Sequence, residues 1–231
     1  MSLVDIVLAS EGAITTGYQL YQSKSYQEAV DALEPVIEQL RPMQHEHPPF
    51  FLLYIHLAQA LQHSSNAKYA LGETNEAIQD WQEMLAVYDS ALAITADEVE
   101  REFAVVFNNT IDTKNVPGII SEAIATAAAY SFSLSKVLKE AGQVEAAIHY
   151  RKSARETYER LFAEDTHEIQ ASTLVPAALT FATMCLTDGR YGRAERMYYL
   201  AAAAQTELAQ VDRELIRHGL RMVGQLAVMR N

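Results

Sequence analysis

A short pattern that occurs four times constrains the fold of this chain more than any other feature of its sequence. Each copy starts at a turn, continues with an acidic or polar residue, and then has an alanine followed by an apolar residue. The copies are SYQEAVDAL from Ser25, GETNEAIQDW from Gly72, GQVEAAIHY from Gly142 and GRYGRAERMYY from Gly189. Self-similarity of this kind is typical of proteins built from stacked supersecondary units.

An apolar stretch with helical periodicity precedes each turn, so each copy is predicted to be a hairpin of two helices. The four stretches are residues 4–22, 50–71, 119–141 and 168–187. The first helix of a hairpin is expected to end at Gly72, Gly142 or Gly189. The residue after a helix often takes the left-handed conformation, and glycine adopts this conformation at the lowest energetic cost. In the first copy Lys24 or Ser25 must take this position.

The spacing of the copies predicts two lobes. The aligned alanines Ala29, Ala77, Ala147 and Ala194 are 48, 70 and 47 residues apart. The longer middle interval contains TADEVEREF, a short amphipathic helix, and the turn-rich NNTIDTKNVPG. We therefore expect an acidic pair of hairpins in residues 1–108, a connection in 109–118, and a second pair in 119–231 that ends with a capping helix from about Leu208 to Met229.

Composition indicates the all-α class. Glycine and proline are few, alanine is frequent, and β-branched residues rarely alternate with polar ones, so strands are disfavoured. Pro35 lies inside a predicted helix, where a kink is expected. Cys185 is the single cysteine, which excludes an internal disulfide and suits a reducing compartment. No apolar run reaches the roughly 18 residues of a membrane span, so we expect a soluble, cytoplasmic protein with no membrane insertion.

The charge of the chain is unevenly distributed. Residues 1–117 hold 5 Lys and Arg against 17 Asp and Glu, whereas residues 118–231 hold 13 of each. The net charge of −12 argues against nucleic acid as a partner, because binding to phosphates requires a basic surface.

The four turns resemble the tetratricopeptide repeat. The matching residues are Gly17, Tyr26 and Ala29 in the first copy, with Pro42 near the usual closing proline; Gly72 and Ala77 in the second; Gly142, Ala147 and Ala154 in the third; and Gly189, Tyr191, Ala194 and Ala201 in the fourth. The copies are longer than the usual 34 residues, and EDTHEIQASTLVPAALTFATMCLTDGRYGRAERMYY is similar to the longer repeats of kinesin light chains. The resemblance implies antiparallel helix hairpins stacked as a right-handed superhelix with a C-terminal capping helix.

The resemblance also implies a function. First helices of tetratricopeptide hairpins line a concave groove that holds a peptide or helix of a partner protein, so we expect a non-catalytic adaptor or scaffold. The groove residues carried over by alignment are Tyr18, Tyr21, Gln62, Asn66, Tyr69, Phe132, Lys136, Lys139, Leu179 and Thr183. Packing between hairpins is an equally good interpretation of the tyrosines, and plain solvent exposure is an alternative for Asn66 and the two lysines.

A second candidate surface lies near the C-terminus. Arg213, Arg217 and Arg221 recur every four residues and share one face of a helix. This face could meet an acidic partner, or the acidic half of a second copy, which would make the protein a homo-oligomer. A solvated face is the alternative.

No catalytic constellation occurs in the sequence, so neither enzyme activity nor a cofactor or metal is expected. His45 and His47 are expected on a loop beside two prolines, and His167 follows Glu164 at a ligand-like spacing. A metal-dependent helical-bundle enzyme is therefore a minor alternative. Another is a regulator in which a peptide or metabolite changes the angle between the two lobes.

Overall fold

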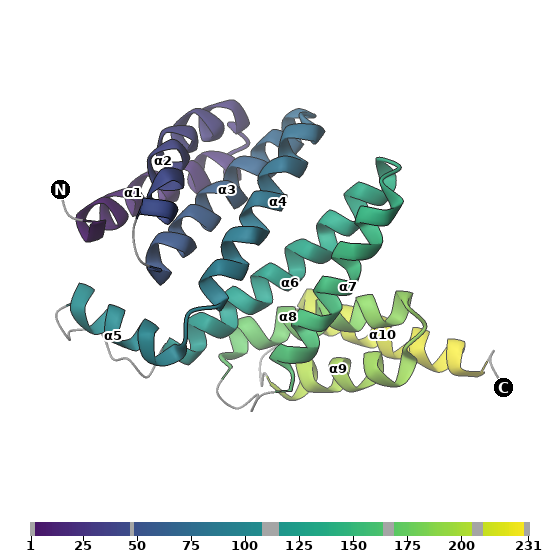
Figure 1. Cartoon of the computed structure of the whole chain (residues 1–231). Helices are drawn as coiled ribbons and strands as arrows, with labels where there is room; N and C mark the ends of the chain where they lie inside the picture. Colours follow the sequence, from purple (N-terminus) through teal and green to yellow (C-terminus); the bar gives the residue numbers. More distant parts are fainter. Residues whose placement is uncertain (1–2, 47–48, 108–115, 164–168, 205–209, 229–231) are drawn as a thin grey trace. The chain divides into compact units, whose positions relative to one another are not determined.

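The computed structural model describes residues 3–46, 49–107, 116–163, 169–204 and 210–228. These residues form ten α-helices and no β-strand, which confirms the predicted all-α class (Figure 1). The helices are α1 (Leu3–Gln22), α2 (Tyr26–Glu46), α3 (Phe51–Leu71), α4 (Thr74–Leu92), α5 (Ala96–Val106), α6 (Val116–Glu140), α7 (Val144–Leu161), α8 (Ala171–Thr187), α9 (Tyr191–Ala203) and α10 (Gln210–Val228).

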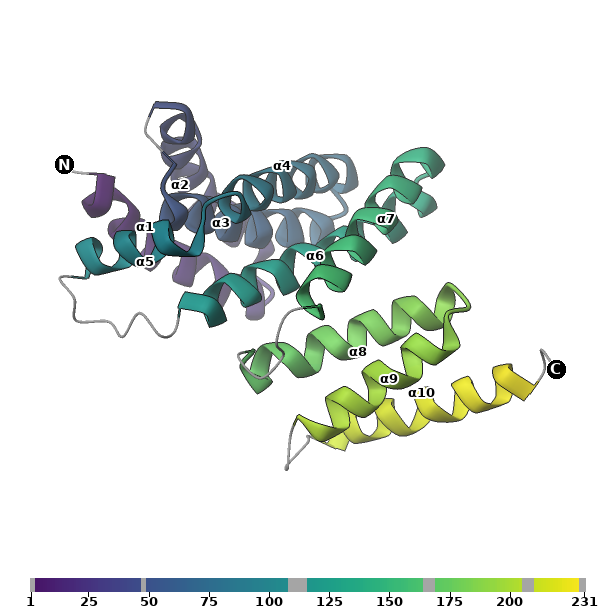
Figure 2. The same ribbon diagram turned by 60° about the horizontal axis from the view of Figure 1, so that its bottom comes forward.

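The helices pack into two compact units. The first unit comprises Met1–Ala123 with Lys136–Gln143, and the second comprises Ile124–Ser135 with Val144–Asn231. In the first, α1 to α4 pack each on the next and α1 also packs on α3; in the second, α7 to α10 pack in succession (Figure 2). Packing of consecutive helices is the arrangement expected of a helical repeat. The connection predicted at 109–118 lies mostly outside the described residues, so the predicted domain boundary stays a prediction.

The turns between paired helices have the predicted backbone conformation. Gly72, Gly142 and Gly189 have φ values of 87°, 78° and 70°, and Lys24 takes the equivalent position with φ 66°. At the end of α3, the N–H of Gly72 donates to the Tyr69 carbonyl at 3.1 Å, which uses a carbonyl that the helix end leaves open. The prediction that Lys24 or Ser25 replaces glycine in the first copy is confirmed for Lys24.

Small residues lie where paired helices approach each other. The aligned alanines of all four copies are buried near the starts of α2, α4, α7 and α9. In the first hairpin, a Cβ added to Gly17 of α1 would come within 2.5 to 2.8 Å of the Leu33 side chain of α2. Glycine at this position is therefore required by the close approach of two helices, as the repeat resemblance implies.

Helix α2 differs from the expectations for this part of the chain. It continues through Pro35 and Pro42 and ends at Glu46, so Pro42 does not close the first repeat. Buried residues on both sides of Pro35, including Leu33 and Ile37, supply the packing that offsets its missing N–H donor. His45 lies in the last turn of this helix, and its expected place on a loop is wrong.

A carboxylate of α5 caps the start of α3. The Glu102 carboxylate accepts hydrogen bonds from the N–H of Phe51 at 2.7 Å and of Leu52 at 2.8 Å. Phe50, at the N-cap of α3, provides no side-chain hydrogen bond. Because the first N–H groups of a helix have no partner within it, Glu102 replaces a local cap with one from 51 residues further along the chain.

Glu102→Ala is therefore expected to lower the free energy of unfolding of the first unit by about 1 to 2 kcal/mol. Urea unfolding followed by circular dichroism measures the change. Glu100→Ala is the matched control, because Glu100 is exposed on the same helix. Equal losses in the two variants would show that the Glu102 cap contributes nothing.

Candidate functional site

Two contacts show how α1 and α3 lie in the first unit. The Oγ of Ser10 lies 2.9 Å from Nδ1 of His56, and the ring centroid of Tyr18 lies 4.9 Å from that of His63. Tyr18 follows Ser10 in α1, and His63 follows His56 in α3, so the two helices run in the same direction. This is the arrangement expected of the first helices of successive hairpins.

The aromatic surface of the first unit consists of Tyr18, His63, Asn66, Tyr69 and Trp81. Tyr18 is 44% exposed and Tyr69 is 42% exposed, although each ring rests on another. Tyr69 packs on the buried Trp81 of α4 with centroids 5.3 Å apart. Trp81 donates a hydrogen bond from Nε1 to Oδ1 of Asn66 at 3.3 Å. Of the side chains that the sequence assigned to the groove, Tyr18 thus packs on His63 of α3, whereas Asn66 and Tyr69 of α3 both contact Trp81 of α4.

The packing of α1 on α3 disfavours the charged forms of His56 and His63. Burial lowers the pKa of both imidazoles below 6.5, and for His56 a hydrogen bond to the Val7 backbone and the charge of Glu11 oppose the shift only in part. The unfolded chain takes up protons at these positions at a higher pH than the folded chain does. Stability is therefore lost as the pH falls below about 6.5.

The first unit is expected to be less stable at pH 5.5 than at pH 7.5, and the double variant His56→Gln/His63→Gln should lose less over the same interval. Urea unfolding of both proteins at the two pH values measures the difference. Buried carboxylates with raised pKa values, such as Asp89, change stability in the opposite direction but are common to both proteins. An equal pH dependence in the two proteins would contradict the assignment to these histidines.

The other predicted groove residues occupy different environments. Tyr21 is half-buried and packs against the core cluster of Ala29, Val30 and Ala67. Gln62 and Thr183 are half-buried, Lys136 and Lys139 are exposed on α6, and Phe132 and Leu179 are buried. Phe132 lies beneath the guanidinium of Arg151 at 5.4 Å. The binding role of each of these residues stays a prediction.

The basic stripe of α10 is exposed as a whole. Arg213, Arg217 and Arg221 are all exposed, and Nε of Arg221 donates to the Arg217 carbonyl at 3.3 Å. The stripe has the accessibility that a second binding surface requires. Its partner stays a prediction.

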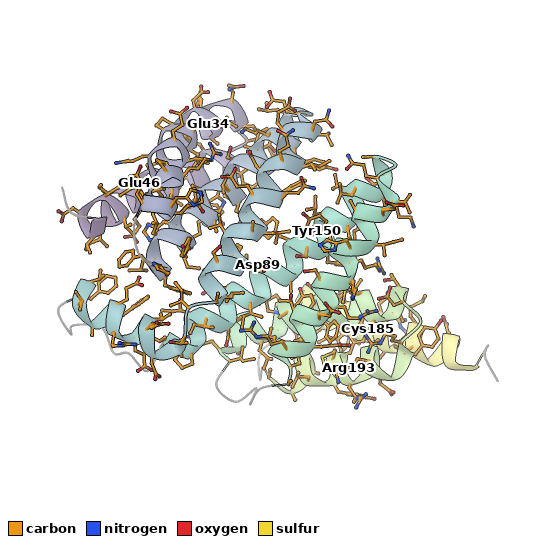
Figure 3. The ribbon with its side chains drawn as sticks, in the orientation of Figure 1. Glu34, Glu46, Asp89, Tyr150, Cys185 and Arg193 are labelled. Carbon is orange, nitrogen blue, oxygen red and sulfur yellow. The ribbon has the colours of Figure 1, made fainter. Side chains whose placement is uncertain are left out.

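Ion pairs join α2, α3 and α4. Nζ of Lys68 lies 2.6 Å from a carboxylate oxygen of Glu34, which is labelled in Figure 3, and 2.7 Å from one of Asp80. Arg41 makes a bidentate pair with Glu83 at 2.7 and 2.9 Å. These contacts fix α2, α3 and α4 against one another and thereby position the helix that carries Asn66.

Within the described part of the chain, no group of three or more His, Cys, Asp or Glu side chains is arranged to hold a metal. His47 and His167 lie outside the described residues. Cys185 is buried in α8, and burial raises the pKa of its thiol to about 11. The thiol is therefore neutral at physiological pH and suited to packing rather than nucleophilic attack. No described helix is long and apolar enough to cross a membrane.

Comparisons with known proteins leave the family open. No family model matches the sequence, and no curated protein matches it. The structure is similar to the crystal structure of BtubC (BKLC) from P. vanneervenii at 14% sequence identity, with 89% of this chain and 92% of that chain covered and a TM-score of 0.35. Membership of the tetratricopeptide family therefore stays a prediction, whereas the all-α arrangement of helix hairpins is observed.

Proposed function

We propose that this protein is a non-catalytic module that binds a segment of a partner protein on the aromatic surface of its first unit. One observation carries the proposal: Tyr18 and Tyr69 are exposed, yet their rings are already placed on His63 and Trp81. A fixed aromatic ring provides a large contact area and loses little conformational entropy when a partner binds. Both helices that present these tyrosines are first helices of successive hairpins.

Asn66 acts in this proposal as a positioning residue. Its amide oxygen accepts the hydrogen bond of the Trp81 indole, and Trp81 in turn supports Tyr69. Asn66 therefore holds the platform on which the partner lies.

The charge of the first unit determines the kind of partner. The first unit, residues 1–123 with 136–143, contains 19 acidic and 7 basic residues, and two of the basic residues, Arg41 and Lys68, are already paired with carboxylates. A basic partner segment is complementary to this field, which increases the rate of association and disfavours acidic competitors. The absence of an internal disulfide supports a reducing compartment, and we place the interaction in the cytoplasm.

Selection of peptides from a random display library tests the proposed function. We expect peptides that share a basic composition and bind more weakly as the salt concentration rises, because salt screens the attraction to the acidic unit. The same selection with Tyr18→Ala/Tyr69→Ala as bait is the control for the surface. Recovery of acidic or unrelated peptides, or the same peptides with both baits, would contradict the proposal.

A further inference from the structure

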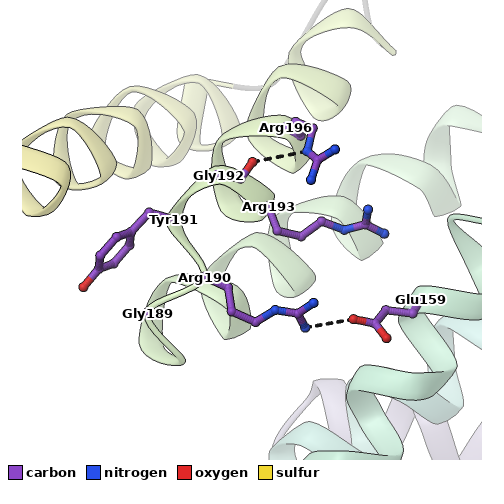
Figure 4. A pocket seen from close by; sticks show the side chains of 7 residues that line it. All are labelled: Glu159, Gly189, Arg190, Tyr191, Gly192, Arg193 and Arg196. Carbon is purple, nitrogen blue, oxygen red and sulfur yellow. Dashed lines mark hydrogen bonds and ion pairs between the residues drawn. The ribbon is translucent and has the colours of Figure 1, made fainter.

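A pocket of about 630 Å³ lies at the start of α9, in the second unit. Its lining is Glu159 of α7 together with Gly189, Arg190, Tyr191, Gly192, Arg193 and Arg196. Figure 4 shows that the three arginine side chains leave α9 in the same direction, whereas Tyr191 points the opposite way. We refer to this site as the arginine pocket.

The arginine pocket carries an excess of positive charge. Its three guanidinium groups face one lining carboxylate, that of Glu159, which pairs with Nη1 of Arg190 at 2.8 Å. Nε of Arg196 donates to the Gly192 carbonyl of its own helix at 3.3 Å. Nε of Arg193 is buried and has no hydrogen-bond partner among the residues that the structure describes. A local charge of about +2 therefore remains on these four side chains at neutral pH.

Arg190 at the N-cap and Arg193 in the first turn of α9 occupy positions that are unfavourable for cations without an anion nearby. The first turn of a helix carries partial positive charge, so acidic side chains are normally found there and cations are repelled. In α9 the first turn contains no acidic residue, and Arg190 at the N-cap makes no side-chain cap. Departures of this kind from the usual placement of charges in a helix are often found at functional sites.

The pocket is held in shape by the core beneath it. The guanidinium of Arg193 lies 5.6 Å above the ring of Phe181, which is fully buried and stacks on Phe162 and Tyr158 with centroids 5.6 and 5.2 Å away. Gly189 takes the left-handed conformation that allows α9 to start directly after α8. A bound anion would therefore meet a cation that is already oriented.

We infer that the arginine pocket binds a phosphate monoester. Planar guanidinium groups match phosphate oxygens with paired hydrogen bonds, and the first N–H groups of a helix point toward an anion placed there. A phosphate monoester carries about −1.5 to −2 charges at pH 7, which matches the excess of the pocket better than one carboxylate does. The phosphate competes with Glu159 for Arg190. This inference does not depend on the aromatic surface of the first unit.

Titration of the isotope-labelled full chain with inorganic phosphate tests the inference. The NMR resonances of the arginine Nε–Hε groups at positions 190, 193 and 196 should shift and saturate together. A neutral peptide with one phosphoserine, compared with its unphosphorylated form, distinguishes the two sources of the phosphate group. Tighter binding of the phosphopeptide identifies a phosphorylated chain as the ligand, and equal or tighter binding of inorganic phosphate identifies a small phosphate compound.

Matched variants distinguish a specific binding site from a general attraction of anions to positive charge. Arg196→Gln should weaken the binding of the better probe about tenfold, and Glu159→Gln should strengthen it about threefold, because the competing carboxylate is removed. Lys152→Gln, which removes a cation that is 64% exposed on α7, should leave it unchanged. Unsaturated shifts with both probes, an equal loss in Lys152→Gln, or weaker binding in Glu159→Gln would overturn the inference.

Discussion

Gly219→Ala is expected to lower the free energy of unfolding of the second unit by about 3 kcal/mol. Gly219 lies in α10 and faces the ring of Tyr198 in α9, which is buried. A Cβ added to Gly219 would overlap Cζ and both Cε atoms of this ring. Because a buried tyrosine ring cannot turn away as a flexible side chain would, α10 must move away from α9 or the variant unfolds more easily.

Gly224→Ala is the matched control in the same helix. A Cβ added at Gly224 meets no atom within 4 Å, so the change only replaces glycine by a better helix former, and stability should rise by up to about 1 kcal/mol. Urea unfolding followed by circular dichroism compares both variants with the wild type. Similar effects of the two substitutions would contradict the packing of α10 on α9.

Lys68→Ala is expected to cost about 2 to 3 kcal/mol of stability in the first unit. Lys68 neutralises Asp80, whose side chain is only 14% exposed, and Glu34, whose side chain is 37% exposed. Burial already raises the pKa of Asp80, and the ion pair with Lys68 opposes that effect. Removal of the ammonium group leaves a largely buried carboxylate without its counter-charge.

Lys152→Ala provides the comparison with an exposed ion pair. Nζ of Lys152 lies 3.7 Å from Glu156, and their side chains are 64% and 59% exposed, so this variant should lose less than about 0.5 kcal/mol. The loss in Lys68→Ala should also shrink as the pH falls toward 4, where protonation removes the unpaired charge of Asp80. A loss that is as small as that of Lys152→Ala, or that does not depend on pH, would show that the Lys68 pair is not needed.

Features that depend on neighbours in the sequence could be predicted. A residue in the left-handed region suits a tight turn between paired helices, and this preference identified Gly72, Gly142 and Gly189 correctly and narrowed the first turn to Lys24 or Ser25, of which the structure has Lys24. Helical periodicity likewise located the helices to within a few residues. Gly17, which the repeat resemblance singles out, leaves room for the Leu33 side chain, and the four aligned alanines are buried.

Features that depend on distant parts of the chain could not be predicted. Glu102 caps the start of helix α3, 51 residues earlier in the chain. No local sequence signal distinguishes Glu102 from the exposed carboxylates around it. The alignment of the repeats predicts that Asn66 lines the binding groove. It does not indicate that the amide oxygen of Asn66 accepts a hydrogen bond from the Trp81 indole. In the fourth copy, the sequence contains Arg190, Arg193 and Arg196 at intervals of three residues, but the local pattern predicts only a turn of the repeat.

Binding on the aromatic surface is tested most directly by the affinity of one selected basic peptide for three proteins. These are the wild type, Tyr18→Ala/Tyr69→Ala, and Tyr199→Ala, whose tyrosine is 58% exposed on α9 of the second unit. Isothermal titration calorimetry should show a loss of about tenfold or more in the double variant and no change in Tyr199→Ala, with circular dichroism spectra that agree among all three. Equal affinity of the folded double variant and the wild type would contradict the proposed binding surface.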